Sequence, residues 1–301
     1  MTAITAEEAF QAYEAVRHRL PATRSSGRRI RRVATLAEIA GEFDVFLLDA
    51  FGVLNIGDTA IPGACARVDG LRAGGKRVLV VSNAASVPQS DLLEKYRRLG
   101  FHFDLDDIVT SRATMAGSMG EMPAITWGVM GSAPAGLDDL GGAKTTPLGD
   151  DPAAYGAVEG FLLISSGTWT ERRQGLLEAA LRARSRPVLV ANPDIVAPRE
   201  HGFSVEPGHF AHRLADSTGI VPLFFGKPFA NIYDLAFARL GAVDKARVVM
   251  VGDSLHTDIL GAQSAGIASA LVVRHGFFAG WDARGAIDRA GIEPDFIVDI
   301  P

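Results

Sequence analysis

The sequence is short of several features that would point to particular classes of protein. It has one cysteine, Cys65, so no disulfide can form within the chain, and a reducing compartment such as the cytoplasm is expected. No apolar run approaches the roughly 20 residues of a membrane-spanning helix, and residues 1–10 lack the apolar stretch of a signal peptide. There is no basic excess, because the formal net charge is -5. Neither a membrane nor a nucleic acid is therefore expected as a partner.

The composition that remains is that of an ordinary globular protein, with 48% hydrophobic and 22% charged residues. A chain of 301 residues has room for about two domains. Apolar side chains between Phe10 and Leu20 recur at helical spacing and predict an amphipathic helix over residues 5–20. The basic stretch Arg24–Arg32 that follows predicts a solvated loop that leads into a second helix.

From residue 43 onward, short apolar runs alternate with helical patterns. The runs are Val45–Leu48, Val78–Val81, Ile108–Val109, Val221–Phe225, Val248–Val251, Leu271–Val273 and Phe296–Val298. Consecutive apolar residues are typical of strands that are buried on both faces. Strands in alternation with helices predict a parallel sheet covered on both sides, which is an α/β fold.

Residues 121–206 interrupt this rhythm, because they are rich in Gly, Pro and Ala and have a pattern of their own. They contain three apolar runs and one helical segment, at Ile125–Met130, Gly160–Ile164, Pro187–Ala191 and Thr170–Ala183. We interpret this region as a smaller α/β domain inserted into the first. The core would then comprise residues 1–120 and 207–301, with residues 1–40 as an N-terminal helical extension.

Polar side chains follow four of the predicted strands, at the carboxyl ends where ligands gather in open parallel sheets. They are Asp49 after the first run, Ser82 and Asn83 after the second, Lys227 in Gly226-Lys227-Pro228, and Asp253 with Asp258 after Val248–Val251. Each is weak evidence alone, since an Asp after a strand is often a loop residue or a helix cap. Their order along the chain and their complementary charges are what indicate a common site.

These residue types fit one reaction. Asp49 and Asp253 can hold a hard cation, which offsets the repulsion between a carboxylate nucleophile and a phosphate. One oxygen of Asp49 can then attack phosphorus and form a covalent intermediate. Ser82 and the backbone after it can donate hydrogen bonds to phosphate, and Lys227 can bridge the Asp49 carboxylate and a phosphate oxygen. Pro228 is expected at the first position of the next helix, which would place Lys227 at a helix N-terminus that favours anions.

On these residues the chain resembles the haloacid dehalogenase superfamily. The four motifs of that superfamily are similar to Asp49-Ala-Phe-Gly-Val-Leu54, Ser82-Asn83, Lys227 in its Gly-Lys-Pro, and Gly252-Asp253-Ser-Leu-His-Thr-Asp258. The insertion at residues 121–206, with Ala191-Asn-Pro-Asp194 and Gly160-Phe-Leu-Leu163, resembles the cap of class IIA members. The resemblance implies a Rossmann-like parallel sheet core with an inserted α/β cap.

The resemblance also implies a metal site. Mg²⁺ would be held by Asp49, by the backbone carbonyl of Phe51 and by Asp253. Asp258 would assist by orienting the waters of the metal or Lys227. Asp49 would be the catalytic nucleophile, with Lys227 as its catalytic partner.

For the substrate, the resemblance implies a small phosphorylated molecule. Ser82, Asn83 and Lys227 would bind its phosphate, while Asn192 and Asp194 in the cap are candidates for binding the rest of it. Caps of this class often mediate dimers, so a homodimer is an open alternative to a monomer.

One position departs from the family pattern. Typical phosphatases of this superfamily have a second Asp two residues after the nucleophile, which protonates the leaving group, and here that position is Phe51. General acid–base catalysis contributes about a hundred- to ten-thousand-fold, so we expect a preference for substrates with stable leaving groups. Phe51→Asp is then expected to raise the rate on alkyl phosphates. His256 could supply the proton, although a structural role in its loop is the favoured interpretation.

Two other functions stay open beside a magnesium-dependent phosphatase that acts through an aspartyl-phosphate. A dehalogenase, in which Asp49 attacks carbon, also has an aromatic residue at the position of Phe51. It needs no metal, however, and leaves the clustered charges of Asp253 and Asp258 unexplained. A phospho-ligand binding protein that has lost turnover would account for Phe51.

Overall fold

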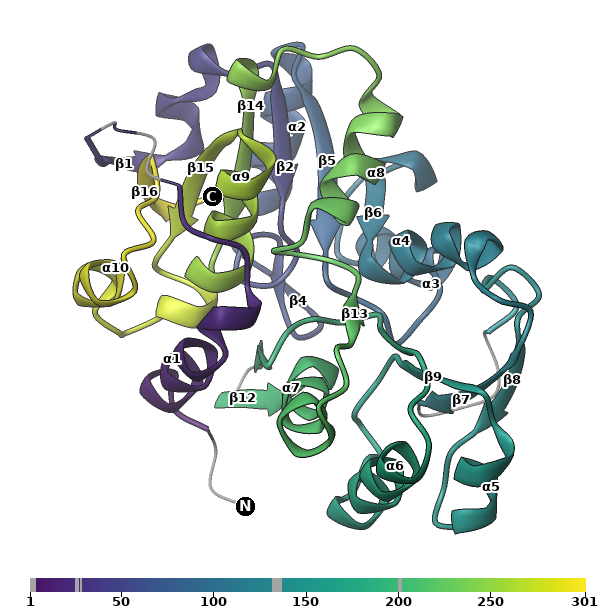
Figure 1. The fold of residues 1–301 in the computed structure, drawn as a ribbon. Helices are drawn as coiled ribbons and strands as arrows, with labels where there is room; N and C mark the ends of the chain where they lie inside the picture. Colours follow the sequence, from purple (N-terminus) through teal and green to yellow (C-terminus); the bar gives the residue numbers. More distant parts are fainter. Residues whose placement is uncertain (1–3, 25–26, 28, 132–136, 200–201) are drawn as a thin grey trace.

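The computed structural model describes residues 4–24, 27, 29–131, 137–199 and 202–301. These residues form a larger and a smaller lobe, each built on a parallel sheet (Figure 1). The larger sheet has seven strands within the described residues, in the order β1 (Arg31–Thr35), β16 (Phe296–Ile300), β15 (Ala268–Val272), β14 (Val248–Gly252), β2 (Val45–Leu48), β5 (Arg77–Ser82) and β6 (Ile108–Thr110). The predicted parallel α/β core is confirmed.

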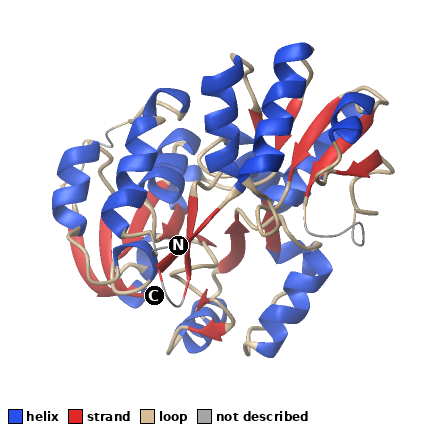
Figure 2. Cartoon of the chain, turned by 90° about the horizontal axis from the view of Figure 1, so that it is seen from below, coloured by secondary structure: helices blue, strands red, loops and turns tan. Residues whose placement is uncertain are grey.

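Helices cover both faces of the larger sheet (Figure 2). Alternate residues of β2 explain this arrangement, because successive side chains of a strand point to opposite faces. Phe46 and Leu48 pack on one face in an apolar cluster with α2 (Ala64–Ala73) and α3 (Gln89–Arg98). On the other face, the β2 residues Val45 and Leu47 join a cluster with α8 (Ala230–Leu240) and α9 (Leu260–Ala265).

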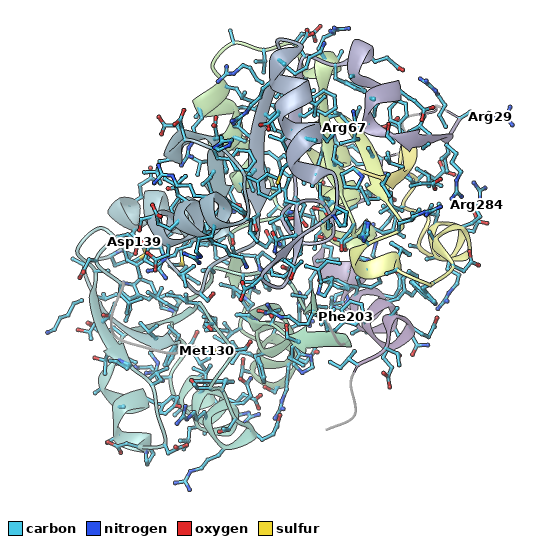
Figure 3. All side chains as sticks on the ribbon, turned by 180° about the vertical axis from the view of Figure 1, so that it is seen from behind. Arg29, Arg67, Met130, Asp139, Phe203 and Arg284 are labelled. Atoms are coloured by element: carbon cyan, nitrogen blue, oxygen red, sulfur yellow. The ribbon has the colours of Figure 1, made fainter. Side chains whose placement is uncertain are left out.

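The smaller sheet has five strands within the described residues. Its order is β13 (Leu223–Phe224), β10 (Val188–Val190), β9 (Gly160–Leu163), β7 (Thr126–Met130) and β8 (Lys144–Pro147). The helices α5 (Pro152–Ala157), α6 (Glu171–Ala183) and α7 (Pro207–Thr218) belong to the same lobe. Figure 3 shows this lobe from behind, with Met130 in it and Asp139 near the junction with the core. Asp139 accepts two hydrogen bonds there from Arg112 of α4 (Ser111–Ser118), which links the two lobes.

The strand before Lys227 was expected in the larger sheet, and that expectation is wrong. β13 pairs with β10 at the edge of the smaller sheet. The sequence of a two-residue apolar strand does not indicate which sheet the strand will join. Only the tertiary fold decides its partner. Because α7 and β13 both pack with the smaller sheet, we propose a cap that extends to about residue 225 rather than 206.

The N-terminal segment also differs from expectation. The predicted helix is shorter, α1 (Ala6–Ala15), and is followed by a 3-10 turn at Arg17–Arg19. Instead of leading into a second helix, the basic stretch leads into β1, which pairs with β16 at the edge of the larger sheet. Strand pairing with a distant partner supplies backbone hydrogen bonds that the local pattern cannot reveal. None of the helices in the described ranges has the length and apolar character needed to span a membrane.

Two short hairpins and the remaining helix complete the fold. One hairpin, β3 (Asn55–Ile56) and β4 (Thr59–Ala60), follows the loop after β2, and the other, β11 (Val196–Arg199) and β12 (Gly202–Val205), lies between β10 and α7. Helix α1 lies beside β12 and against the core near α10 (Ala283–Ala290) (Figure 1). The N-terminal extension thus contacts both lobes.

Candidate active site

Asp49 lies directly after β2. Its backbone N–H donates a hydrogen bond to the Val251 carbonyl of β14 at 2.8 Å, which extends the pairing of the two strands by one residue. Its Oδ1 is 2.6 Å from the Nζ of Lys227. The same ammonium lies 2.8 Å from Oδ1 of Asp258. Lys227 is 2% exposed, so the ion pairs hold its buried charge between two carboxylates.

Asp258 and Asp253 are linked through the backbone of the loop after β14. Oδ2 of Asp258 accepts hydrogen bonds from the backbone N–H groups of Asp253 and Ser254, each at 3.1 Å. Oδ2 of Asp253 accepts one from the backbone N–H of Phe277 at 2.7 Å. Asp258 is completely buried and both of its oxygens are engaged, which suits a group that positions Lys227. Asp253 lines the pocket.

Glycines make room for these carboxylates. Gly52, in the loop that follows β2, has a φ of +74°. Gly276, at the start of the turn before Phe277, has a φ of +69°. A Cβ at either position would collide with the side chain of Asp253, so glycine is required here both by backbone conformation and by space.

The cluster has an excess of negative charge. Oxygens of Asp49, Asp253 and Asp258 lie within 4.8 Å of one another, and Lys227 offsets part of their charge. Burial raises the pKa of Asp49 to about 7, against the opposing effect of Lys227. Burial, reinforced by Asp49 and Asp258, raises the pKa of Asp253 well above its ordinary value. For Lys227, burial disfavours the charged form, but the two carboxylates raise its pKa. Carboxylate oxygens in this arrangement fit a hard divalent cation, whose charge would keep them ionised.

Asn83 fixes the loop that holds Lys227. Its Oδ1 accepts the backbone N–H of Lys227 at 2.7 Å, and its Nδ2 donates to the Lys227 carbonyl at 2.9 Å. The same Nδ2 donates to Oδ1 of Asp194 at 2.7 Å. Ser82 lines the pocket, with its Oγ accepting the N–H of Ala84 at 3.3 Å. Asn83 is therefore engaged in positioning, and Ser82 keeps a hydroxyl proton for a ligand.

The helix after Lys227 begins later than expected. Pro228 was expected at its first position, but α8 begins at Ala230 with Phe229 as the N-cap, and the Lys227–Pro228 peptide is cis. That expectation is wrong. The backbone of Lys227 is held by Asn83 rather than by the start of the helix.

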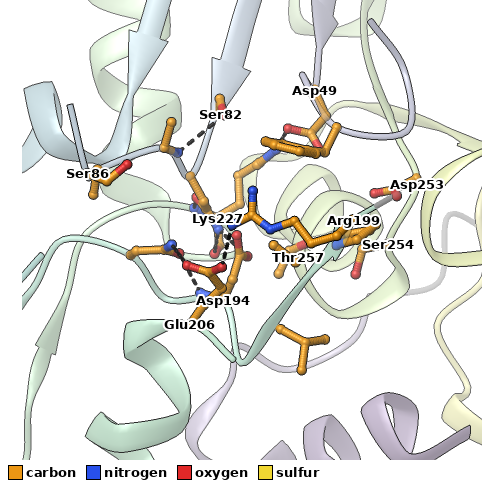
Figure 4. Close-up of a pocket in the computed structure, with 18 of the residues that line it drawn as sticks. Asp49, Ser82, Ser86, Asp194, Arg199, Glu206, Lys227, Asp253, Ser254 and Thr257 are labelled. Carbon is orange, nitrogen blue, oxygen red and sulfur yellow. Dashed lines mark hydrogen bonds and ion pairs between the residues drawn. The ribbon is translucent and has the colours of Figure 1, made fainter. Parts of the chain in front are cut away.

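The cap wall of the pocket has a network of its own. Asn192 donates from Nδ2 to Oε2 of Glu206 at 3.2 Å and accepts the N–H of Asp194 at its Oδ1 at 2.9 Å. Oε1 of Glu206 accepts from Arg199 at 2.9 Å and from Ser204 at 2.5 Å. Figure 4 shows Asp194 and Glu206 on the side of the pocket opposite Asp49 and Asp253, with Lys227 and Arg199 between. Arg199 and Glu206 were not singled out from the sequence, which gives no sign that a hairpin returns to the pocket.

Phe51 lies where the core and the cap meet. The Nζ of Lys95, from α3, is 5.5 Å from the centroid of its ring, and the Cζ of Arg199, from β11, is 5.3 Å from it. All three side chains line the pocket. The ring of Phe51 therefore contacts two cations, each at a distance typical of cation–π contacts.

Tyr13, on the N-terminal helix α1, lines the pocket. The sequence predicted an amphipathic helix here but gave no indication that it would reach the site. The Tyr13 hydroxyl accepts the backbone N–H of Ile195 at 3.1 Å, next to Asp194. Its ring stacks on His256 at 5.1 Å between centroids, and His256 contacts Oε1 of Glu14 at 2.5 Å. Burial lowers the pKa of His256, although Glu14 acts in the opposite direction. His256 lies beneath α1, in keeping with the structural role favoured for it.

These residues surround a pocket of about 320 Å³ between the two lobes. Its floor is formed by Asp49, Ser82, Lys227 and Asp253, and Asp194 lies on its other side (Figure 4). Asn192, which is hydrogen-bonded to the backbone of Asp194, also lines it. This volume is at the small end of ligand pockets. A small molecule with one anionic group at the floor is the ligand that this arrangement suits.

Comparison with known proteins gives consistent matches. Residues 46–136 match the family model described as haloacid dehalogenase-like hydrolase, and residues 224–300 match a second model described as HAD-hydrolase-like. The chain is 30% identical over 250 residues to the D-glycerol 3-phosphate phosphatase of Mycobacterium tuberculosis, covering 82% of this chain and 67% of that protein. The chain belongs to the haloacid dehalogenase superfamily. Within that superfamily it is a hydrolase of the class IIA type, as the resemblance implied.

Solved structures agree in fold. A possible sugar phosphatase from Cytophaga hutchinsonii superposes with a TM-score of 0.79 at 26% identity, covering 91% of this chain and 98% of that one. A glycerol phosphate phosphatase from M. tuberculosis in complex with magnesium superposes with a TM-score of 0.64 at 27% identity, covering 79% of this chain and 69% of that one. The carboxylate cluster of this member of the superfamily and the bound ions of such relatives together identify a divalent metal as its cofactor.

Proposed function

We propose that this protein is a magnesium-dependent phosphatase of a small phosphorylated metabolite and acts through an aspartyl-phosphate on Asp49. The observation that carries the proposal is the buried cluster in which Lys227 lies 2.6 Å from Asp49 and 2.8 Å from Asp258, with Asp253 nearby. Relatives named as phosphatases of glycerol 3-phosphate and of sugars support the same reaction class.

The residues divide the work as follows. Asp49 and Asp253, with the Phe51 carbonyl, would hold the Mg²⁺, which when bound supplies positive charge to the phosphoryl oxygens. Asp49 attacks phosphorus with the oxygen that is free of Lys227, and the ester oxygen leaves as the Asp49–phosphate bond forms. Lys227 and Ser82 stabilise the charge on the phosphoryl group. Water then cleaves the aspartyl-phosphate and restores Asp49.

The test is release of phosphate from p-nitrophenyl phosphate and from glycerol 3-phosphate with Mg²⁺, together with acid-quench trapping of a phosphorylated protein. We expect turnover of the aryl ester and a trapped phosphoprotein that disappears in Asp49→Asn. No turnover of any phosphate ester, with phosphate still bound in the presence of Mg²⁺, would instead favour the binding protein that has lost turnover. Metal-independent release of halide from a haloacid would favour a dehalogenase.

A further inference from the structure

We propose that Asp194, on the cap wall, supplies the proton to the leaving group that Phe51 cannot supply. This inference rests on the proposed phosphatase function and identifies a catalytic residue for it. It follows from the direction in which the leaving group must depart, from the hydrogen bonds of Asp194, and from the engagement of the neighbouring polar groups.

The direction comes from the geometry of phosphoryl transfer. The attacking and leaving oxygens lie roughly in line through phosphorus. Asp49 attacks from the carboxyl end of β2, at the core floor of the pocket. The leaving oxygen therefore emerges on the opposite side, toward the cap wall to which Asp194 belongs (Figure 4).

Asp194 is fixed relative to the nucleophile through one side chain. Nδ2 of Asn83 donates to Oδ1 of Asp194 at 2.7 Å and to the carbonyl of Lys227 at 2.9 Å. Lys227 in turn holds Asp49. Oδ2 of Asp194 has no hydrogen-bond partner among the described residues, and the side chain is partly exposed to the pocket. A carboxyl group with one fixed oxygen and one open oxygen is arranged to donate a proton.

The other cap-side carboxylate that the structure describes is less suited to this task. Both oxygens of Glu206 are occupied, because they accept hydrogen bonds from Asn192, Arg199 and Ser204. Tyr13 is a weak acid here, because burial raises the pKa of its phenol well above the ordinary value, and its hydroxyl oxygen accepts the N–H of Ile195.

The charges that face Asp194 favour its protonated form. Burial, the largest cause, raises the pKa of Asp194 to about 8, and the carboxylates of Asp49 and Glu206 act in the same direction. Asn83 and Lys227 oppose this shift. Tyr13 faces Asp194 from α1, and burial raises its pKa well above the ordinary value, so its phenol is neutral and adds no charge. At neutral pH the carboxyl group therefore has a proton to give.

The step balances in protons and electron pairs. As the bond from Asp49 to phosphorus forms, the ester P–O bond breaks and its electron pair stays on the leaving oxygen. Oδ2 of Asp194 transfers its proton to that oxygen, which leaves as an alcohol. In the second half of the reaction the Asp194 carboxylate takes a proton from the water that attacks the aspartyl-phosphate, and both groups return to their starting states.

The test is the dependence of rate on the leaving group in Asp194→Asn. The amide keeps the size of the side chain and an oxygen that can accept from Asn83, but it has no acidic proton. We expect kcat on glycerol 3-phosphate to fall by about a hundred-fold or more, and kcat on p-nitrophenyl phosphate by less than about tenfold, since nitrophenolate needs no protonation. The matched control is Glu206→Gln, which should change both rates by the same factor.

Turnover by the wild-type protein distinguishes a failure of the Asp194 assignment from a failure of the proposed phosphatase function. If the wild type hydrolyses p-nitrophenyl phosphate but Asp194→Asn loses the same factor on both substrates, or loses nothing, Asp194 is not the donor and the phosphatase function stands. If the wild type hydrolyses no phosphate ester, both proposals are overturned.

A second measurement needs no variant. In the wild type, the dependence of kcat on the pKa of the leaving alcohol should be shallow well below pH 8, where Asp194 is protonated, and steep well above it. The rate on glycerol 3-phosphate should likewise fall as the pH rises through about 8. Equal slopes at the two pH values would overturn the assignment of Asp194.

Discussion

The two sides of the pocket both have carboxylates, but these differ in how many hydrogen bonds and ion pairs hold them. The floor of the pocket and Asp258 beneath it are called the core wall here, and Asp194 and Glu206 belong to the cap wall. On the core wall, Asp258 has both oxygens engaged by Lys227 and by backbone N–H groups, and Asp49 is tied to the same lysine. On the cap wall, Asp194 has one oxygen engaged and one open. The core wall therefore holds charges still for a reaction at phosphorus that is the same for every ester. The cap wall leaves Oδ2 of Asp194 available to the leaving group, which is the part of the substrate that differs from one ester to another.

The supporting elements differ in the same way. Asp49 and Asp253 follow neighbouring strands, β2 and β14, which are buried in the middle of the seven-stranded sheet. Arg199 and Glu206 lie on or beside a two-stranded hairpin. Side chains on a buried sheet keep their positions more rigidly than side chains on a short hairpin.

The largest effect is expected from removing the proposed nucleophile on the core wall. Asp49→Asn keeps the size of the side chain but not its nucleophilic charge, so we expect kcat to fall by at least about a thousand-fold on aryl and alkyl phosphates alike. Phosphate release and thermal melting of both proteins provide the measurement. Substantial activity in a folded Asp49→Asn variant would exclude Asp49 as the nucleophile.

Removal of the metal should have nearly as large an effect. Without the metal ion, the carboxylates of Asp49, Asp253 and Asp258 repel one another. Burial raises the pKa of Asp49 and of Asp253, which disfavours the ionised nucleophile. EDTA should abolish turnover, and Mg²⁺ should restore it. Full activity after exhaustive chelation would contradict the metal site.

A smaller effect is expected from Phe51→Asp, and here the structure revises the expectation from sequence. A carboxylate at this position would lie near Lys95 and Arg199, and these cations would lower its pKa and keep it ionised. We therefore expect kcat on glycerol 3-phosphate to rise by less than about tenfold. The measurement is the ratio of alkyl to aryl rates in both proteins. A rise of a hundred-fold would indicate that position 51 can provide the acid and that the cap wall does not.

The smallest effect on catalysis is expected from Tyr13→Phe, which tests the tie between α1 and the cap wall. Loss of the hydroxyl leaves the buried N–H of Ile195 without its acceptor, at a cost of about 1–3 kcal/mol in the free energy of unfolding. Urea denaturation measures this cost, and kcat should change by only a few-fold. His18→Phe, at the 3-10 turn beyond α1, is the control and should leave stability nearly unchanged. Equal free energies of unfolding for Tyr13→Phe and the wild type would show that this hydrogen bond does not stabilise the fold.

Much of the core wall could be predicted from the sequence. Asp49, Ser82 and Asp253 each follow an apolar run that becomes a strand of the larger sheet, and parallel strands present their carboxyl ends at one edge. Lys227 was also expected here, but for a partly wrong reason, because its preceding strand joins the smaller sheet. Two hydrogen bonds hold its backbone near Asp49, one accepted by Asn83 from the Lys227 N–H and one donated by Asn83 to the Lys227 carbonyl.

The sequence by itself determined the chemistry of the core wall, since local patterns fix strands and strand ends fix which side chains meet. Only the tertiary structure decided the cap wall. Tyr13 reaches Ile195 across 182 positions of the chain, and Asn83 reaches Asp194 across 111. Such contacts depend on how helices and sheets pack, and the local spacing of apolar residues in the sequence does not reveal this packing. The raised pKa of Asp194 has the same origin, because burial, which only the packed fold creates, is its largest cause.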